Sequence, residues 1–356
     1  MKDSCAGINR KTIHHIAEKS KKGAMRMKAD IITKAYVQNT DIFADIFNYY
    51  VYDGQQIIRP EHLIERDPTA LSLPYGADGA LIPVQRFRDV QKLYASMTDE
   101  KAEYVLYGAE NQSDIHYAMA VRNNLYDALE YAGQVEEASK SHRAAMKQKT
   151  IFGAERKSPS SGEFLSGFWK EDRLIPSITV TIYFGADQWD GPLSLFDMMD
   201  VSDSNILACM DNYHVRLISP AQMSDEEIMK FQSSLREVMF FIKYSKDMKK
   251  LEEILIADEQ RFRNLERRAA DVIKVITHSD FEYSENEVSV NMCQAIQDMK
   301  QKSRLEGKLE GKLEGKLEGK LEVAKQLHKM GFSVDKIAEA IEQTTTEVDK
   351  WLSKES

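Results

Sequence analysis

A carboxylate and an amide, Glu110 and Gln112, stand two residues apart at the end of an apolar run. The run itself, residues 104–107, is typical of a β-strand. Because side chains alternate along a strand, Glu110 and Gln112 should lie on one face, where Gly108 leaves room beside the carboxylate. A carboxylate with a second polar group at a strand end suits metal-dependent hydrolysis of phosphodiesters. A strand that simply reaches solvent would show the same pair.

A second acid, Asp89, stands in an alternating stretch at residues 86–94. The alternation predicts a strand on which Asp89 points the same way as Phe87 and Leu93. A carboxylate among apolar side chains costs free energy unless it is paired or binds a metal ion. Both explanations of Asp89 stay open from the residues alone.

Two helices should flank these strands. After Glu110 and Gln112, apolar residues at helical spacing predict a helix over 115–131, with Ser113 or Asp114 as its cap. Arg122 lies on its otherwise apolar stripe. It could brace Glu110, contact a phosphate, or lay its stem over the core.

The other helix is expected over 41–50, capped by Thr40. Asp45 lies on the polar face of this helix. It could contribute to a metal site, or it could cap the helix or lie at the surface. The buried stripe of this helix should comprise Ile42, Phe43, Ile46, Phe47 and Tyr50.

The order of several short motifs resembles one family, the Rpn family (recombination-promoting nucleases, also called putative transposases) of the PD-(D/E)xK nuclease superfamily. The similarity covers about residues 30–250. It rests on FADIFN at 43–48, RDV at 88–90, ENQ at 110–112, the Met119, Arg122 and Tyr126 helix, and LIPSITVTIYFGADQWDGP at 174–192.

This resemblance implies an α/β, restriction-endonuclease-like core, a mixed central sheet flanked by helices. The residues beyond it predict an all-α C-terminal extension. The resemblance also implies that Asp89 and Glu110 bind Mg²⁺ or Mn²⁺, that Gln112 orients water, and that Arg122 and Asp45 assist. In the superfamily the third position is usually lysine, whereas here it is Gln112, as is common in this family. An amide carries no charge and so cannot act as a cation.

The function implied is a Mg²⁺-dependent DNA endonuclease that hydrolyses phosphodiester bonds and promotes recombination. The alternative is a catalytically decayed DNA-binding or interaction module of a mobile element.

Other elements follow from the same patterns. The residues predict a first strand at 57–58, a polar connector at 134–159, a buried central strand at 175–184, an edge strand at 213–220, a helix from Ser224 to about 244, and a solvated helix at 247–276. Trp189, in the turn after the central strand, is expected to pack at the rim.

Composition limits the function classes. The chain has 356 residues, 42% hydrophobic content and a net charge of −9, which argues against a protein that coats nucleic acid non-specifically. Residues 10–34 are locally basic, either an arm on phosphates or a solvated N-terminus. Three scattered cysteines, no apolar leader and no apolar run of about 20 residues predict a cytoplasmic protein without a membrane span.

The C-terminal third contains a four-residue KLEG repeat with leucine at 305, 309, 313, 317 and 321. Like charges recur at i,i+4 and the glycines weaken the helix, so the segment should need a partner copy or act as a spacer. We expect a dimer through this region. A small helix-turn-helix-like tail should pack Phe332, Ile337, Ile341, Val348 and Trp351.

The domains predicted are a basic arm (1–30), a nuclease-like domain (31–250), a helical linker (251–302), the KLEG-repeat helix (303–322) and the tail (323–356).

Overall fold

The computed structural model describes residues 10–66, 69–72, 84–87, 89–98, 101–152, 158–201, 203–284 and 287–353. Side chains are described for 23–66, 89–95, 105–147, 158–201, 203–284 and 287–353. Two compact units form, one of residues 1–280 and 284–292, the other of 281–283 and 293–356. The division falls within the segment 251–302 that the sequence assigns to a linker.

A five-stranded mixed sheet is the centre of the first unit, in the order β1-β4-β5-β6-β7. β1, β4 and β5 are antiparallel, while β6 runs parallel to both β5 and β7. The strands are β1 Leu63–Glu65, β4 Val90–Thr98, β5 Lys101–Gln112, β6 Ser177–Tyr183 and β7 Arg216–Ile218. A separate hairpin pairs β2 Thr69–Ser72 with β3 Val84–Phe87. The chain is therefore mixed α/β. β7 lies at an edge as the sequence predicts, while β6 is a buried interior strand beside it and β5 is the central strand.

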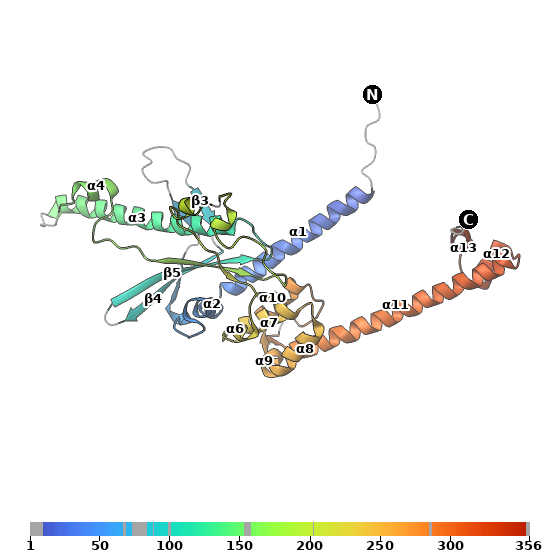
Figure 1. Ribbon diagram of the computed structural model, residues 1–356. Helices are drawn as coiled ribbons and strands as arrows, with labels where there is room; N and C mark the ends of the chain where they lie inside the picture. The colour runs from blue at the N-terminus through green and yellow to red at the C-terminus, as the bar shows by residue number, and fades with distance from the viewer. Residues whose placement is uncertain are drawn as a thin grey trace, which may run out of the picture. The chain divides into compact units, whose positions relative to one another are not determined.

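Helices α2 (Thr40–Tyr52) and α3 (Met119–Phe152) cover opposite faces of this sheet (Figure 1). On the α2 face, the rings of Phe47 and Tyr107 lie 4.3 Å apart. On the α3 face, Asn123 Nδ2 donates to Thr181 Oγ1 at 2.8 Å, and the buried Asp127 accepts from Thr179 Oγ1 at 2.7 Å. These bonds fix α3 on β6, and so fix the side chains that α3 presents to β5.

The long helix α1 (Arg10–Val37) packs against β5 and along α10 (Arg267–Thr277). Two 3-10 turns, six short helices and two short strands complete the described part of the unit. They are η1 Pro60–His62, α4 Ser161–Ser166, η2 Phe196–Met198, α5 Ser204–Leu207, α6 Asp225–Ile228, α7 Leu235–Tyr244, α8 Met248–Ala257, α9 Glu259–Arg263, β8 Leu265–Glu266 and β9 Ser289–Val290. In the described part of the chain, no helix is both long enough and apolar enough to cross a bilayer.

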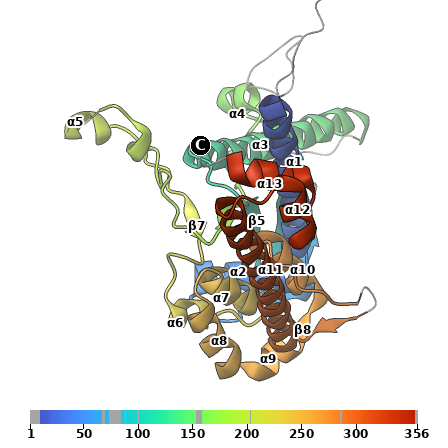
Figure 2. The same ribbon diagram turned by 90° about the vertical axis from the view of Figure 1, so that its right-hand side faces the viewer.

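The segment between β6 and β7 leaves the sheet and carries η2 and α5 outward (Figure 2). Several of its apolar side chains are exposed, namely Leu193, Met198, Val201, Ile206 and Met210. An apolar pattern alone does not distinguish such residues from core residues.

Several predicted boundaries are wrong, each for a local reason. Ile57 and Ile58 form no strand, because their backbone N–H groups donate to Asn48 Oδ1 at 3.1 and 2.7 Å. The strand expected over 86–94 is interrupted at Asp89, which lies in a bend before β4. Tyr50 is 38% exposed, so it is not part of the buried stripe of α2.

The expected polar connector at 134–159 is mostly helix, because α3 extends to residue 152. This part of α3 contacts a polar loop, which explains the lack of an apolar stripe. Gln134 Oε1 accepts from the backbone of Ile175 at 2.7 Å, and His142 Nε2 lies 2.8 Å from Asp172 Oδ2.

The helices expected at 224–244 and 247–276 are also broken. Ser224 forms the predicted capping box, but α6 ends at Ile228 and α7 starts only at Leu235. The second stretch divides into α8, α9 and α10, and α10 is packed rather than solvated. Its buried residues are Ala269, Ala270, Val272 and Ile273.

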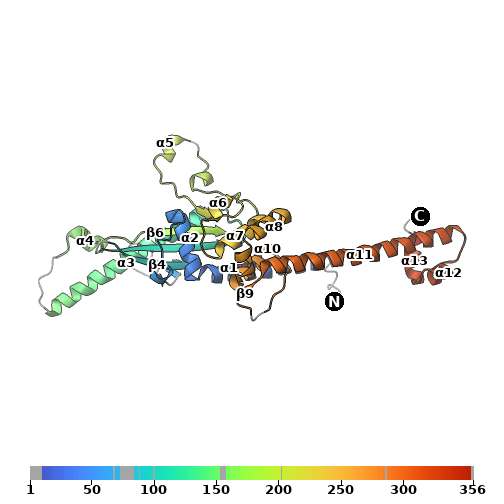
Figure 3. The same cartoon turned by 90° about the horizontal axis from the view of Figure 1, so that it is seen from below.

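In the second unit, α11 (Met292–Lys329) is one continuous helix that leads to α12 (Val334–Ala340) and α13 (Thr345–Leu352) (Figure 3). Its repeat leucines at 305, 309, 313 and 317 are between 50% and 67% exposed. The tail packs as predicted except for Phe332, which is 44% exposed. Its core contains Ala324, Ile337, Ala338, Ile341 and Val348, with Trp351 against them.

Removing everything after Lys300 should reduce the mass of the assembly. Exposed leucines on an intrinsically weak helix are stabilised when a second copy covers them. Sedimentation of the truncated and full-length chains would measure this directly. Identical oligomeric states would exclude self-association through the repeat, while any cleavage of naked plasmid should survive the truncation.

Candidate functional site

Asp89 and Glu110 meet where β4 begins and β5 ends. The strand register pairs Val90 with Ala109, which places Asp89 opposite Glu110. The backbone N–H of Asp89 donates to Glu110 Oε1 at 3.3 Å, and the backbone N–H of Asn111 donates to Asp89 Oδ2 at 2.9 Å. The antiparallel pairing of β4 with β5 therefore brings the two acids together.

Arg122 braces the fully buried Glu110. Its Nη2 atom lies 3.0 Å from Glu110 Oε2, and its Nε atom donates to the hydroxyl of Tyr126 at 3.0 Å. One turn of α3 thus supplies both the cation and the hydroxyl that orients it. Of the roles open to Arg122 from the sequence, the ion pair with Glu110 is the one observed.

Asp89 experiences a different electrostatic environment from Glu110. Burial raises the pKa of Asp89 above its ordinary value, while the hydrogen bond from Asn111 and the charges of Lys34 and Arg122 lower it. Asp30 raises the pKa further. Asp89 is therefore a half-buried carboxylate whose negative charge is only partly compensated.

The donor set fits a hard divalent cation. Two carboxylates provide oxygen ligands, and Asp89 Oδ1 has no hydrogen-bond partner among the described residues. In the same described part, no three His, Cys, Asp or Glu side chains lie close enough together to hold a metal ion. Two carboxylates with water and phosphate are a usual environment for Mg²⁺, so the pair would suffice.

Gln112 lies on the same strand as Glu110, two residues further on. Its Nε2 atom donates to the carbonyl of Asn111 at 2.8 Å, which fixes the side-chain amide at the end of β5. This bond leaves Oε1 to accept a hydrogen bond from water.

Asp45 is not brought to this group. The carboxylate is 2% exposed and accepts bonds from the backbone N–H groups of Gln232 and Ser233, at 2.9 and 2.8 Å, and from Ser233 Oγ at 2.6 Å. It ties α2 to the segment that precedes α7. Its position supports a structural role.

Asp45→Ala should lower the free energy of unfolding by about 2–4 kcal/mol, because three donors to a buried carboxylate lose their acceptor. Denaturant titration measures this change. Asp41→Asn is the control on the same helix. Asp41 is half-exposed and pairs with Arg268, so its loss should cost about 1 kcal/mol or less. Equal effects of the two changes would argue against the structural role of Asp45.

Sequence reasoning missed two residues of α1, Asp30 and Lys34, which lie close enough to act on Asp89. Ser113 Oγ donates to Asp30 Oδ1 at 2.8 Å, and Arg26 Nε lies 2.9 Å from Asp114 Oδ2. Ser113 and Asp114 thus contact α1 and do not cap α3. The four-residue spacing of Arg26, Asp30 and Lys34 was the available signal, hidden within a stretch that is mostly basic.

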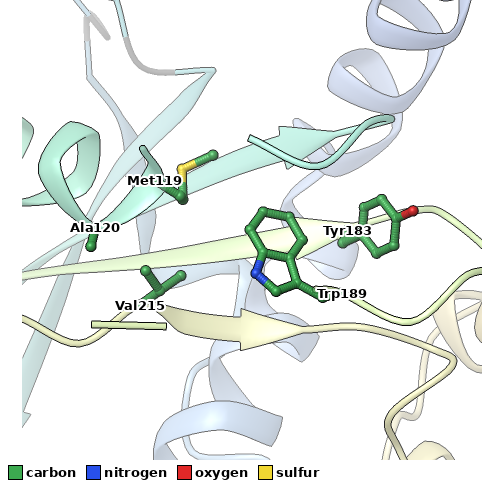
Figure 4. Packing of buried hydrophobic residues seen from close by; sticks show 5 residues of the cluster. All are labelled: Met119, Ala120, Tyr183, Trp189 and Val215. Carbon is green, nitrogen blue, oxygen red and sulfur yellow. The ribbon is translucent and has the colours of Figure 1, made fainter. Parts of the chain in front are cut away.

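A small apolar cluster fixes the start of α3 relative to the sheet (Figure 4). Met119 and Ala120 from α3 pack with Tyr183, Trp189 and Val215. Trp189 is 5% exposed, and its indole Nε1 donates to the carbonyl of Gly191 at 3.0 Å. Trp189 is therefore a packing residue as predicted, but it is buried in a core cluster and does not lie at the rim. It holds the first turn of α3, from which Arg122 reaches Glu110.

Comparisons with protein family models, with curated proteins and with solved structures find no match to this chain.

Proposed function

We propose that this protein is a Mg²⁺- or Mn²⁺-dependent DNA endonuclease of the Rpn type that hydrolyses phosphodiester bonds. The observation that carries the proposal is the contact of Asp89 with Glu110 where β4 begins and β5 ends, 3.3 Å between Asp89 N and Glu110 Oε1. The mixed sheet with a helix on each face agrees with the restriction-endonuclease-like core that the sequence resemblance implies.

Each side chain of the site has a separate role. Asp89 and Glu110 present the oxygen ligands, and Arg122 fixes the orientation of Glu110 through the 3.0 Å ion pair. When bound, a divalent cation supplies Lewis-acid polarisation of a phosphate oxygen. Gln112 orients a water molecule through Oε1, because its Nε2 is held by the carbonyl of Asn111.

One observation favours the alternative, a DNA-binding module whose site has decayed. Arg122 already neutralises Glu110, and the third position of the motif is the uncharged Gln112. Assays of DNA cleavage and of DNA binding distinguish the two functions.

Supercoiled plasmid incubated with Mg²⁺ or Mn²⁺ should be nicked by the wild-type chain and left intact in EDTA. The thermal midpoint of the protein should also rise with either ion, because binding to the folded state stabilises it. If the protein binds DNA but does not nick it, and its thermal midpoint does not rise with either ion, the result would support the decayed module instead.

A further inference from the structure

Three charged residues on α1, Arg26, Asp30 and Lys34, follow one another at four-residue intervals and so share one face of the helix. Arg26 pairs with Asp114, and Asp30 accepts from Ser113. From Arg26 to Asp30 along α1, the partner residue changes from Asp114 to Ser113, which is one residue closer to the end of β5.

Lys34 lies one turn, about 5.4 Å, beyond Asp30 along α1. By the same progression, Lys34 lies level with the last residues of β5. α1 packs against β5, which is the strand that carries Glu110 and Gln112. The charge of Lys34 lowers the pKa of Asp89, which lies opposite Glu110 in the register. The stripe is thus directed toward the end of β5, where the two acids lie.

Among the described residues, Lys34 also differs from the other basic residue of this stripe in having no ion-pair partner. Arg26 is paired with Asp114 and Arg122 with Glu110, whereas Lys34 has no ion pair within 4.0 Å among the described residues. A partly buried ammonium without a carboxylate partner can accept a phosphate oxygen as a point charge.

The site lacks a cation for its substrate at the position of Gln112. We propose that Lys34, supplied by α1, contacts the phosphate of the substrate strand and takes the role that lysine would have at position 112. This inference rests on the proposed nuclease function. Lys34 would stabilise the charge that develops on the phosphate during cleavage, and Gln112 would be left to orient water.

Lys34→Met tests the inference, because it removes the charge and keeps most of the side-chain volume. Plasmid cleavage should fall about 100-fold, the usual effect of losing one stabilising donor. The ion-dependent rise in thermal midpoint should be retained or become larger, since a positive charge near Asp89 opposes cation binding. Lys28→Met is the matched control, an exposed lysine on a different face of α1, and should cleave like the wild type.

Gln112→Lys in the Lys34→Met background gives the decisive result. If Lys34 fills the role of the absent lysine, the double variant should regain at least 10-fold of the lost cleavage. A Lys34→Met variant that cleaves like the wild type would overturn the inference. So would a variant that loses both cleavage and the ion-dependent midpoint shift without rescue by Gln112→Lys, because that pattern indicates a structural lysine. A wild-type chain that neither nicks nor responds to ions would refute the proposed function itself.

Discussion

Asp89→Asn should reduce plasmid cleavage by about three orders of magnitude or more, while the protein stays folded. The amide keeps the size of the carboxylate, and its Oδ1 can still accept the 2.9 Å bond from the backbone of Asn111. What is lost is the negative charge that a hard cation requires. The ion-dependent rise in thermal midpoint should disappear together with cleavage.

Without added ions, the same variant should be at least as stable as the wild type at neutral pH. Burial raises the pKa of Asp89, so ionising this group costs folding free energy above its unfolded pKa. The cost is absent at lower pH, where Asp89 is protonated in both states. The stability difference should therefore shrink as the pH falls toward about 4, close to the pKa of an unperturbed aspartate.

Asp187→Asn is the control for Asp89→Asn. Asp187 is 73% exposed and pairs with Lys246 on the surface, so neither cleavage nor stability should change appreciably. If Asp89→Asn melts lower than the wild type while cleaving equally well, Asp89 is a structural residue and the metal-site assignment is wrong.

Arg122→Met should destabilise the fold by about 3–5 kcal/mol, because it leaves a buried carboxylate without its cation. Glu110 is 0% exposed at the side chain and Arg122 is 32% exposed, so Glu110 has little solvent to replace the guanidinium. Denaturant unfolding at pH 7 measures the loss. Arg143→Met, on an exposed position of α3, should be nearly neutral.

The double variant Arg122→Met with Glu110→Gln separates the ion pair from simple packing. If the cost is the unpaired charge, the double variant should be more stable than Arg122→Met alone. Strictly additive losses would show that the stem of Arg122, laid over the core, accounts for the effect. The same cycle measured with Mg²⁺ present would show how far a bound cation substitutes for the arginine.

The sequence was most informative where a simple period decides the structure. Two-residue alternation placed Glu110 and Gln112 on one strand, and the antiparallel pairing of β4 with β5 brings Asp89 beside them. These are local relations, since strand alternation and a hairpin involve only near neighbours along the chain.

The sequence was least informative where a polar group has a distant partner. The carboxylate of Asp45 and its donors at Gln232 and Ser233 are separated by almost 190 residues, and spacing along α2 gives a face but no partner. The second half of α3 contacts a polar loop, so its pattern lacks the apolar stripe that marks a helix. Lys34 was hidden for a similar reason, because most of the charges around it are basic and nothing distinguishes it until α1 is placed against β5.

Because α11 is a continuous helix, the number of KLEG units sets its length and rotation in fixed steps. Each four-residue unit adds about 6 Å of length and advances the helix by about 40°, since four residues exceed one turn by that angle. Gain or loss of a whole unit would leave the rows of leucine, glutamate, glycine and lysine unbroken. The small core around Ala324, Ile337 and Val348 would then be shifted along and around the helix in fixed increments, without any change in its own packing.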